Sequence, residues 1–342
     1  MISNKQIFLP VIGLSCNSNC IMCSVDSKKK DSAEGTTEQV IKDLIKGRQE
    51  GYERMEFTGG EPTVRKDIII LIQKAKELGY TNIGISTNGI LLSDKKFCDR
   101  LVKAGLTNIT FSLHAHNKTL HEVISCTPGA FNKTVSGIKN TVTYKDLLVS
   151  VVTVIFRPNY KYIFQIGKFI HSLGVSCWDI TDLLPEGRAK KNYETLYVKR
   201  TELSDVLHTL KPLLDDFQSI VFFAFSPCVI PSDVLYDKRV TLITAQQKLD
   251  VEKPLRYNQK KSLMNPIDDD SNNIHQRKIK ICQNCIFSKQ CAGIWADYLN
   301  LFGGKEIEKL ATKYSYLNSG NLTGHNQKTI KKELNRRFNN RI

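Results

Sequence analysis

The sequence predicts an α/β protein: a partial (β/α)6 barrel over residues 5–190, followed by a small cysteine-rich domain. Between residues 7 and 185, short runs rich in β-branched residues alternate with amphipathic helical stretches, and the rhythm stops after Pro185. Strands that alternate with helices of this length form a parallel sheet with right-handed crossovers. The even rhythm favours a TIM-like barrel, with its chemistry at the carboxyl ends of the strands.

The elements of the barrel are expected in a regular order. Strands are expected at Ile7–Leu14, Arg54–Thr58, Ile83–Ser86, Asn108–Leu113, Leu148–Phe156 and Trp178–Leu184. Helices are expected at Thr37–Gln49, Asp67–Leu78, Asp94–Ala104, Phe131–Thr143 and Tyr160–Leu173. Apolar residues recur with helical spacing in these stretches, and glycines follow several of them as stop signals.

The rest of the chain is expected in three parts. Residues 191–225 read as a linker with one helix and the strand Ile220–Phe225. Residues 226–315 read as the cysteine-rich domain, irregular at first and ending in a helix pair around Gly303. Residues 316–342 read as a polar, basic helix or loose tail.

Composition narrows the function classes. The chain has 342 residues, 41% of them hydrophobic, and ten cysteines. No apolar run is long enough to span a membrane, and the short run before Cys16 is broken by Pro10, so neither a membrane span nor a secretory signal is expected. Cysteines in such a chain favour metal binding or catalysis over disulfides, and a cytoplasmic location. The net charge of +15 suits an anionic partner, or only a solvated lysine-rich surface.

Cys16, Cys20 and Cys23 follow the first expected strand with the spacing C-x3-C-x2-C. Three thiolates on one short loop can ligate three irons of a 4Fe–4S cubane and leave the fourth iron open to a substrate. Zinc normally takes four ligands in a closed structural site, and no fourth Cys or His follows within the next thirty residues. A zinc loop and a chance cluster remain the alternatives.

Further motifs end the later strands, and together with the cysteine loop they resemble the radical S-adenosylmethionine (SAM) superfamily. Gly59-Gly60-Glu61-Pro62 looks like the family's GGEP motif, which holds the methionine amino group of SAM. The resemblance implies that polar residues at the next strand ends contact the ribose and carboxylate of SAM, and that its adenine rests near the sixth strand's end. These positions are Ser86, Asn88, Ser112, His114, Arg157 and Leu184. Met22 departs from the aromatic residue often found before the third cysteine.

The resemblance also implies a mechanism. A reduced 4Fe–4S cluster donates one electron to the sulfonium of SAM, which breaks into methionine and a 5′-deoxyadenosyl radical. That radical abstracts a hydrogen from the substrate. A reductant such as flavodoxin or ferredoxin is the expected electron donor.

A second cysteine group lies near the end of the chain. Cys282, Cys285 and Cys291 precede a run of aromatic residues, and Cys228 lies upstream. The run resembles the auxiliary-cluster extension of the SPASM and twitch subfamilies, but it is shorter than a full SPASM domain. The resemblance implies one auxiliary 4Fe–4S cluster, with Cys228 as the candidate fourth ligand. A structural zinc site is the alternative.

The substrate stays open at this point. The leading hypothesis is an enzyme that modifies a peptide or protein, as many SPASM and twitch members do. A small-molecule reaction on a nucleotide or cofactor precursor, as in the molybdopterin cyclases, is the second hypothesis. RNA modification is suggested only by the charge. The non-enzyme alternative is an iron–sulfur electron carrier, which would have no need of a methionine-binding carboxylate such as Glu61.

Overall fold

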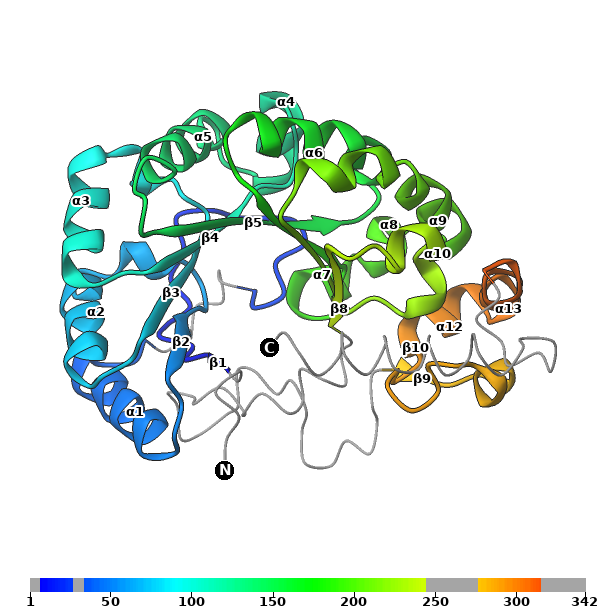
Figure 1. The fold of residues 1–342 in the computed structure, drawn as a ribbon, viewed down its shortest axis with the longest axis horizontal. Helices are drawn as coiled ribbons and strands as arrows, with labels where there is room; N and C mark the ends of the chain where they lie inside the picture. The colour runs from blue at the N-terminus through cyan, green and yellow to red at the C-terminus, as the bar shows by residue number, and fades with distance from the viewer. Residues whose placement is uncertain (1–6, 27–33, 244–275, 315–342) are drawn as a thin grey trace.

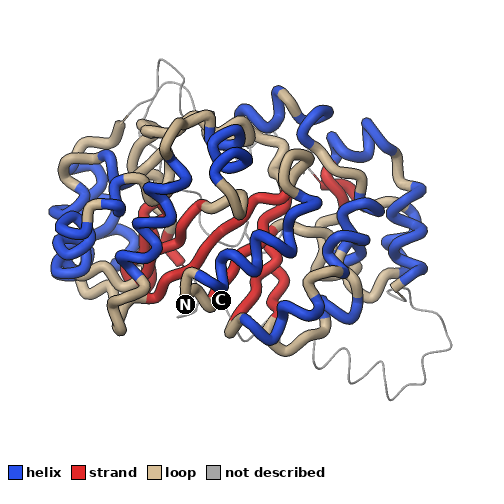
Figure 2. The backbone as a smooth tube through the Cα atoms, turned by 90° about the horizontal axis from the view of Figure 1, so that it is seen from above, coloured by secondary structure: helices blue, strands red, loops and turns tan. Residues whose placement is uncertain are grey.

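A computed structural model describes residues 7–26, 34–243 and 276–314 of the chain. Its centre is one all-parallel sheet of eight strands, hydrogen-bonded in sequence order from β1 to β8. The sheet is curled into an open barrel, with helices on its convex side (Figure 1). Seen from above, the strands lie at the centre and the helices around them (Figure 2). The expected α/β partial barrel is confirmed.

The strands are short and follow the sequence closely. They are β1 (Ile7–Phe8), β2 (Arg54–Phe57), β3 (Asn82–Thr87), β4 (Asn108–Ser112), β5 (Leu148–Ile155), β6 (Cys177–Asp182), β7 (Ser219–Phe223) and β8 (Val240–Ile243). Val151, Trp178 and Ile220 lie side by side in register, and all are fully buried. Such rows form the apolar layer between the sheet and its helices.

Helices connect the strands and cover the outer face of the sheet. The larger ones are α1 (Thr37–Gln49), α2 (Ile68–Glu77), α3 (Lys95–Ala104), α4 (Lys118–Ser125), α5 (Ala130–Thr141), α6 (Ile163–Ser172) and α9 (Arg200–His208). Shorter ones are α7 (Gly187–Lys191), α8 (Tyr193–Leu196) and α10 (Ser232–Leu235). Helix α1 begins with a capping box, in which Thr36 and Gln39 bond to each other's backbone amides. None of the described helices is long and apolar enough to cross a membrane.

The six-unit expectation needs one correction, because the sheet has eight strands. β7 lies beside β6 and β8 beside β7, so the sheet continues into the segments assigned above to the linker and the cysteine-rich domain. The strand at Ile220–Phe225 was recognisable, but three helices (α7 to α9) precede it and hide the repeat. β8 has only four residues, which is too short to stand out in an irregular stretch. Helix α4 was also missed.

The C-terminal elements pack beside the end of the sheet that carries β8 (Figure 1). They are the antiparallel pair β9 (Gln276–Arg277) and β10 (Ile294–Trp295), followed by α12 (Ala296–Phe302) and α13 (Lys305–Lys313). The last two are the expected helix pair around Gly303. Helix α13 contacts α9. The tail expected at 316–342 lies outside the described residues.

Candidate active site

The chain before Cys16 runs beside the chain that follows β2. The Gly60 amide donates to the Gly13 carbonyl oxygen (2.9 Å), and the Glu61 amide donates to the Ser15 carbonyl oxygen (2.7 Å). These bonds continue the parallel pairing of β1 with β2 beyond the regular strands. The cysteine loop therefore starts at a fixed place, at the carboxyl end of the sheet.

Two glycines make this close approach possible. A Cβ atom on Gly60 would lie 2.3 Å from the Ser15 oxygen, and one on Gly59 would lie 2.2 Å from the Gly13 oxygen. Gly59 also has a φ of +127°, which favours glycine. The first half of the Gly-Gly-Glu-Pro motif is thus required by contact with the cysteine loop, independently of any ligand.

Inside the loop, Ser18 ties the cysteines to the end of α4. Its hydroxyl donates to the Ser125 carbonyl oxygen (3.2 Å) and lies 3.4 Å from the Cys20 sulfur. Its amide donates to the Cys16 sulfur (3.3 Å). Ser18 is only 3% exposed, so the loop is folded around it.

The other side of the loop is held by the segment after β6. The Arg188 amide donates to the Cys23 carbonyl oxygen (2.9 Å). The Arg188 guanidinium donates to the Asn19 carbonyl oxygen (3.1 Å) and lies 3.4 Å from the Asp26 carboxylate. Gly187 has a φ of +54°, and a Cβ there would lie 2.6 Å from the Cys23 oxygen. Arg188 therefore contacts both arms of the cysteine loop.

The three thiols lie close enough to influence one another. Burial raises the pKa of Cys20 to about 11, and the neighbouring Cys23 and Cys16 raise it further, while Arg188 lowers it. No three Cys, His, Asp or Glu side chains in the described part of the chain form a group that could hold a single metal ion as they stand. In a cubane each thiolate binds its own iron, so the sulfurs do not converge on one point. Three mutually close thiols on one anchored loop are a donor set that fits such a cluster.

Glu61 lies at the junction of β2 and β3. Its carboxylate accepts hydrogen bonds from the Thr63 amide (3.0 Å), the Thr87 hydroxyl (2.7 Å) and the Asn88 amide (2.6 Å). Burial raises its pKa, although these bonds lower it, and the residue is 2% exposed. Glu61 thus joins the two strand ends, and Pro62 follows it as the first residue of a short 3-10 turn.

Asn88 is an expected cofactor residue that contacts the cysteine loop. Its side-chain amide donates to the Asn17 side chain (2.7 Å) and lies 3.9 Å from the Cys16 sulfur. Ser86, which lies two residues earlier in β3, instead donates to Glu56 on the inner side of the barrel. The structure therefore brings Asn88 to the loop and places Ser86 deeper in the barrel.

His114 follows β4, close to Ser112, and is buried. The Val154 amide donates to its Nδ1 atom (3.3 Å), so the ring carries its proton on Nε2. Burial, with a contribution from His121, lowers the pKa of His114 to about 3. The ring stays neutral at physiological pH and can act as an N–H donor.

Arg157 and Leu184 complete the expected cofactor residues. The Arg157 guanidinium donates to the Tyr197 carbonyl oxygen (3.1 Å) and to Glu202 (2.9 Å). It is therefore held by α9, and a role in binding the SAM carboxylate would require it to leave Glu202. Leu184 packs on the apolar cluster that contains Met22.

The second cysteine group is also gathered in space. Burial raises the pKa of Cys228 well above its usual range, and the next contributions come from Cys291, Cys285 and Cys282. The Gly293 amide donates to the Cys291 sulfur (3.3 Å). All four cysteines therefore lie within electrostatic reach of one another, although Cys228 is far from the others in sequence.

Sequence reasoning missed the polar inner face of the barrel, where Glu56 and Asp179 lie in the middle of strands. An acidic residue inside a strand of a parallel barrel was the available signal.

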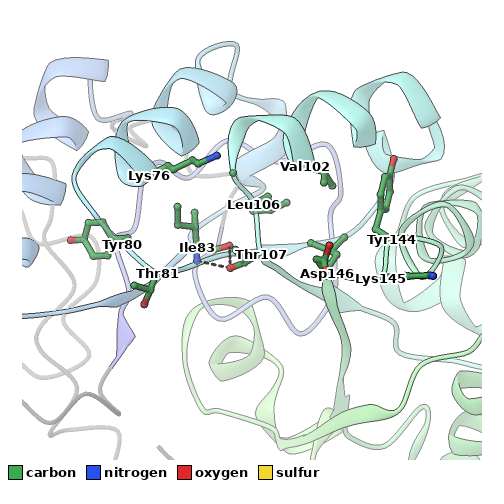
Figure 3. A pocket seen from close by; sticks show the side chains of 12 residues that line it. Lys76, Tyr80, Thr81, Ile83, Val102, Leu106, Thr107, Tyr144, Lys145 and Asp146 are labelled. Atoms are coloured by element: carbon green, nitrogen blue, oxygen red, sulfur yellow. Dashed lines mark hydrogen bonds between the residues drawn. The ribbon is translucent and has the colours of Figure 1, made fainter.

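A separate hollow of about 390 Å³ lies at the opposite, amino-terminal ends of β3 to β5, lined among others by Lys76, Tyr144 and Lys145 (Figure 3). It is remote from the cysteine loop, and the chemistry above does not use it.

Comparison with known proteins identifies the class. Residues 11–170, which include the cysteine loop and the strand ends up to β5, match the radical SAM superfamily. The matched residues therefore form a radical SAM domain, and this family implies a 4Fe–4S cluster and SAM as cofactors.

Particular relatives differ in their named activities. The chain is 30% identical over 176 residues to the probable GTP 3′,8-cyclase of Saccharolobus solfataricus, which is 52% of this chain and 56% of that protein. The chain thus spans little more than half the length of such relatives. Among solved structures it resembles Streptococcus suis SuiB bound to S-adenosylmethionine, with a TM-score of 0.60, 16% identity, and coverage of 90% of this chain and 76% of that one. HydG, a maturase of the [FeFe]-hydrogenase, gives a TM-score of 0.53 with 11% identity, covering 98% of this chain and 83% of that one. At these identities the structures show a shared fold.

Proposed function

We propose that this radical SAM enzyme cleaves SAM reductively and abstracts a hydrogen from a peptide or protein substrate. The observation that carries the proposal is the anchoring of the loop with Cys16, Cys20 and Cys23 directly onto the Gly59–Pro62 segment. A cluster on the loop and a methionine moiety at the motif would be neighbours.

The residues of this chain have distinct parts in the proposal. Cys16, Cys20 and Cys23 would hold the 4Fe–4S cluster, which when bound supplies the electron that breaks the C–S bond of SAM. The Gly59–Pro62 backbone and Glu61 would hold the methionine amino group. Asn88 lies where it can contact a ligand on the cluster, since its side-chain amide is 3.9 Å from the Cys16 sulfur. The protein's work is to orient the reactants and exclude water.

The second cysteine group supports an auxiliary 4Fe–4S cluster held by Cys228, Cys282, Cys285 and Cys291. Four thiols are the usual ligand count for a cubane and also for a structural zinc. The resemblance of residues 226–315 to the SPASM and twitch extensions favours iron.

A second candidate substrate is a purine nucleotide. The named relatives are probable GTP 3′,8-cyclases, and their similarity to this chain favours this reading. The fold shared with SuiB, which has been seen bound to its precursor peptide, supports the peptide reading. The TM-score in that case is 0.57 at 13% identity.

Anaerobically reconstituted protein tests the proposal. With a strong reductant, it should form 5′-deoxyadenosine from SAM, and the triple replacement of Cys16, Cys20 and Cys23 by Ala should abolish this. Replacement of Cys98 by Ala is the matched control. Cys98 is a buried residue of α3, and its thiol donates to the Leu92 carbonyl oxygen. Deuterium transfer into 5′-deoxyadenosine from deuterated GTP or from deuterated peptides then separates the two substrate classes. Retained cleavage in the triple variant would overturn the proposal.

Metal analysis tests the auxiliary cluster. Two cubanes give about eight irons per chain. About four irons with one zinc would show that the second group holds zinc instead.

A further inference from the structure

We propose that the inner face of the barrel is a binding site in which Glu56 and Asp179 hold a cationic nitrogen group of the substrate, an alkylammonium or a guanidinium. The inference rests on the proposed function and deepens it by naming the chemistry that the substrate must present. It is carried by the placement of two acidic side chains on β2 and β6.

Strand alternation fixes the direction of Glu56. Its neighbours Met55 and Phe57 are 0% exposed and belong to the core between sheet and helices. Successive side chains of a strand point to opposite faces. Glu56 therefore points to the inner, concave side of the sheet.

Strand alternation also fixes the direction of Asp179. Trp178 and Ile180 are 0% exposed. Trp178 faces helix α6, because a Cβ on Gly167 would lie 2.7 Å from its ring. Asp179 thus also points inward, and the charge of Glu56 acts on it across the barrel.

Hydroxyl groups surround Glu56 on this inner face. The Ser86 and Thr110 hydroxyls donate to its carboxylate. The Ser150 hydroxyl in turn donates to Thr110 (3.1 Å). Ser86, Thr110 and Ser150 are register neighbours on three adjacent strands. Branched apolar residues usually fill this layer of a barrel, so a polar row here is suited to a ligand.

Asp179, unlike Glu56, has no hydroxyl group of the described residues bonded to its carboxylate. Within the described residues its carboxylate makes no hydrogen bond and no ion pair, and the one charge that acts on it is that of Glu56. Burial raises its pKa to about 7. The cation that acts on Glu56 is Arg54, which lies two residues earlier on β2, toward the amino end.

A cationic ligand would satisfy this arrangement. A half-buried carboxylate without a partner is unfavourable, and a cation with several N–H groups can bond to both acids at once. A guanidinium binds a carboxylate through two parallel hydrogen bonds. An ammonium binds it instead as a compact charge with three N–H donors. A phosphate would be repelled here, in contrast to the basic balance of the whole chain. Lysine and arginine side chains and free amino groups of a peptide have the required chemistry.

Binding of small probes to the reconstituted full-length protein tests the inference. Isothermal titration calorimetry at constant ionic strength should show saturable binding of n-butylguanidinium and n-butylammonium, and none of n-butanol. Asp179→Asn and Glu56→Gln should each weaken the binding about tenfold or more, as expected for loss of a charge-assisted hydrogen bond. Asp205→Asn is the matched control, because Asp205 is 68% exposed on α9, where it pairs with Lys313. Circular dichroism confirms that each variant is folded, and the two acids provide independent variants.

Each outcome decides the inference. Equal binding to wild type and both acid variants, or no binding of either cation, overturns it. Binding of GTP that depends on Asp179, without binding of the cations, also overturns it and favours the nucleotide reading. SAM cleavage measured on the same samples keeps the two proposals apart: cleavage without cation binding removes this site alone, whereas cation binding without cleavage removes the proposed function.

Discussion

Arg200, at the start of α9, donates two parallel hydrogen bonds to Asp182, the last residue of β6, at 2.9 and 2.6 Å. The Arg200 side chain is 0% exposed, and it lies over the ring of Tyr197 at 4.6 Å. The Trp295 indole also donates to Asp182 (3.0 Å). Since Trp295 follows Cys291 by four residues, this buried pair joins the mouth of the barrel to the second cysteine group.

Breaking this pair should destabilise the protein strongly. Removing one partner of a buried ion pair leaves an uncompensated charge and typically costs about 3–5 kcal/mol. Arg200→Met and Asp182→Leu should each lower the free energy of unfolding by this order, measured by urea denaturation. The double replacement should cost less than the sum of the two, because it leaves no buried charge.

Lys313→Ala is the matched control for these variants. Lys313 pairs with Asp205 on the surface, where the two side chains are 55% and 68% exposed. Its loss should change stability by no more than about 1 kcal/mol. A similar effect of the surface and buried replacements would contradict the structural role of Asp182 and Arg200.

Gly60→Ala should loosen the cysteine loop from the sheet. The added methyl group would lie 2.3 Å from the Ser15 oxygen and 2.4 Å from the Leu14 oxygen, so the chain before Cys16 must move. We expect incomplete cluster assembly, seen as reduced iron and sulfide per chain, together with about 1–3 kcal/mol of destabilisation. Gly129→Ala is the control, because a Cβ there meets nothing within 4 Å and only its positive φ is strained. Equal iron contents in the two variants would sink this prediction.

Arg188→Ala should weaken the hold of the loop on its cluster. Arg188 bonds to Asn19 inside the loop and faces Asp26 at its end. Residues that orient metal ligands typically contribute about 10- to 100-fold to metal affinity. We expect iron loss to a chelator to be at least about tenfold faster than in wild type, followed by the decay of cluster absorbance. Lys190→Ala, on the same short helix but exposed, should lose iron at the wild-type rate.

Much of the barrel could be predicted from the sequence because local signals agree with the fold there. The β-branched run at Leu148–Ile155 and the glycine after α3 mark their elements without tertiary information. The cysteine spacing likewise fixed one loop as a candidate site. These features depend on residues close together in the chain.

Other features depend on long-range packing and escaped prediction. β8 is a strand because β7 offers it an edge, not because its four residues demand it. Arg157 could be assigned to a strand end, but its pairing with Glu202 depends on where α9 lies. Similarly, the charge of Arg200 gave no hint that it would be buried against Asp182, since that contact requires the connection after β6 to fold back.

Two buried histidines should make the stability of the protein depend on pH. Burial lowers the pKa of His114 to about 3 and that of His121 to about 4, whereas an unfolded chain has a histidine pKa near 6.5. Between these values the unfolded state binds more protons, so stability is fully present above about pH 6.5 and falls as the pH is lowered toward 4. Each group contributes up to about 1.4 kcal/mol per pH unit in that window.

His121→Phe separates the contribution of one ring. The rings of His114 and His121 are stacked with centroids 6.3 Å apart, and the ring of Phe131 also contacts His121. An aromatic replacement of His121 therefore keeps the packing. Urea unfolding at pH 7 and pH 5 should show a smaller loss of stability in the variant than in wild type, by up to about 2 kcal/mol over that interval. If the His121 variant loses as much stability on acidification as wild type, the ring is not held neutral by burial.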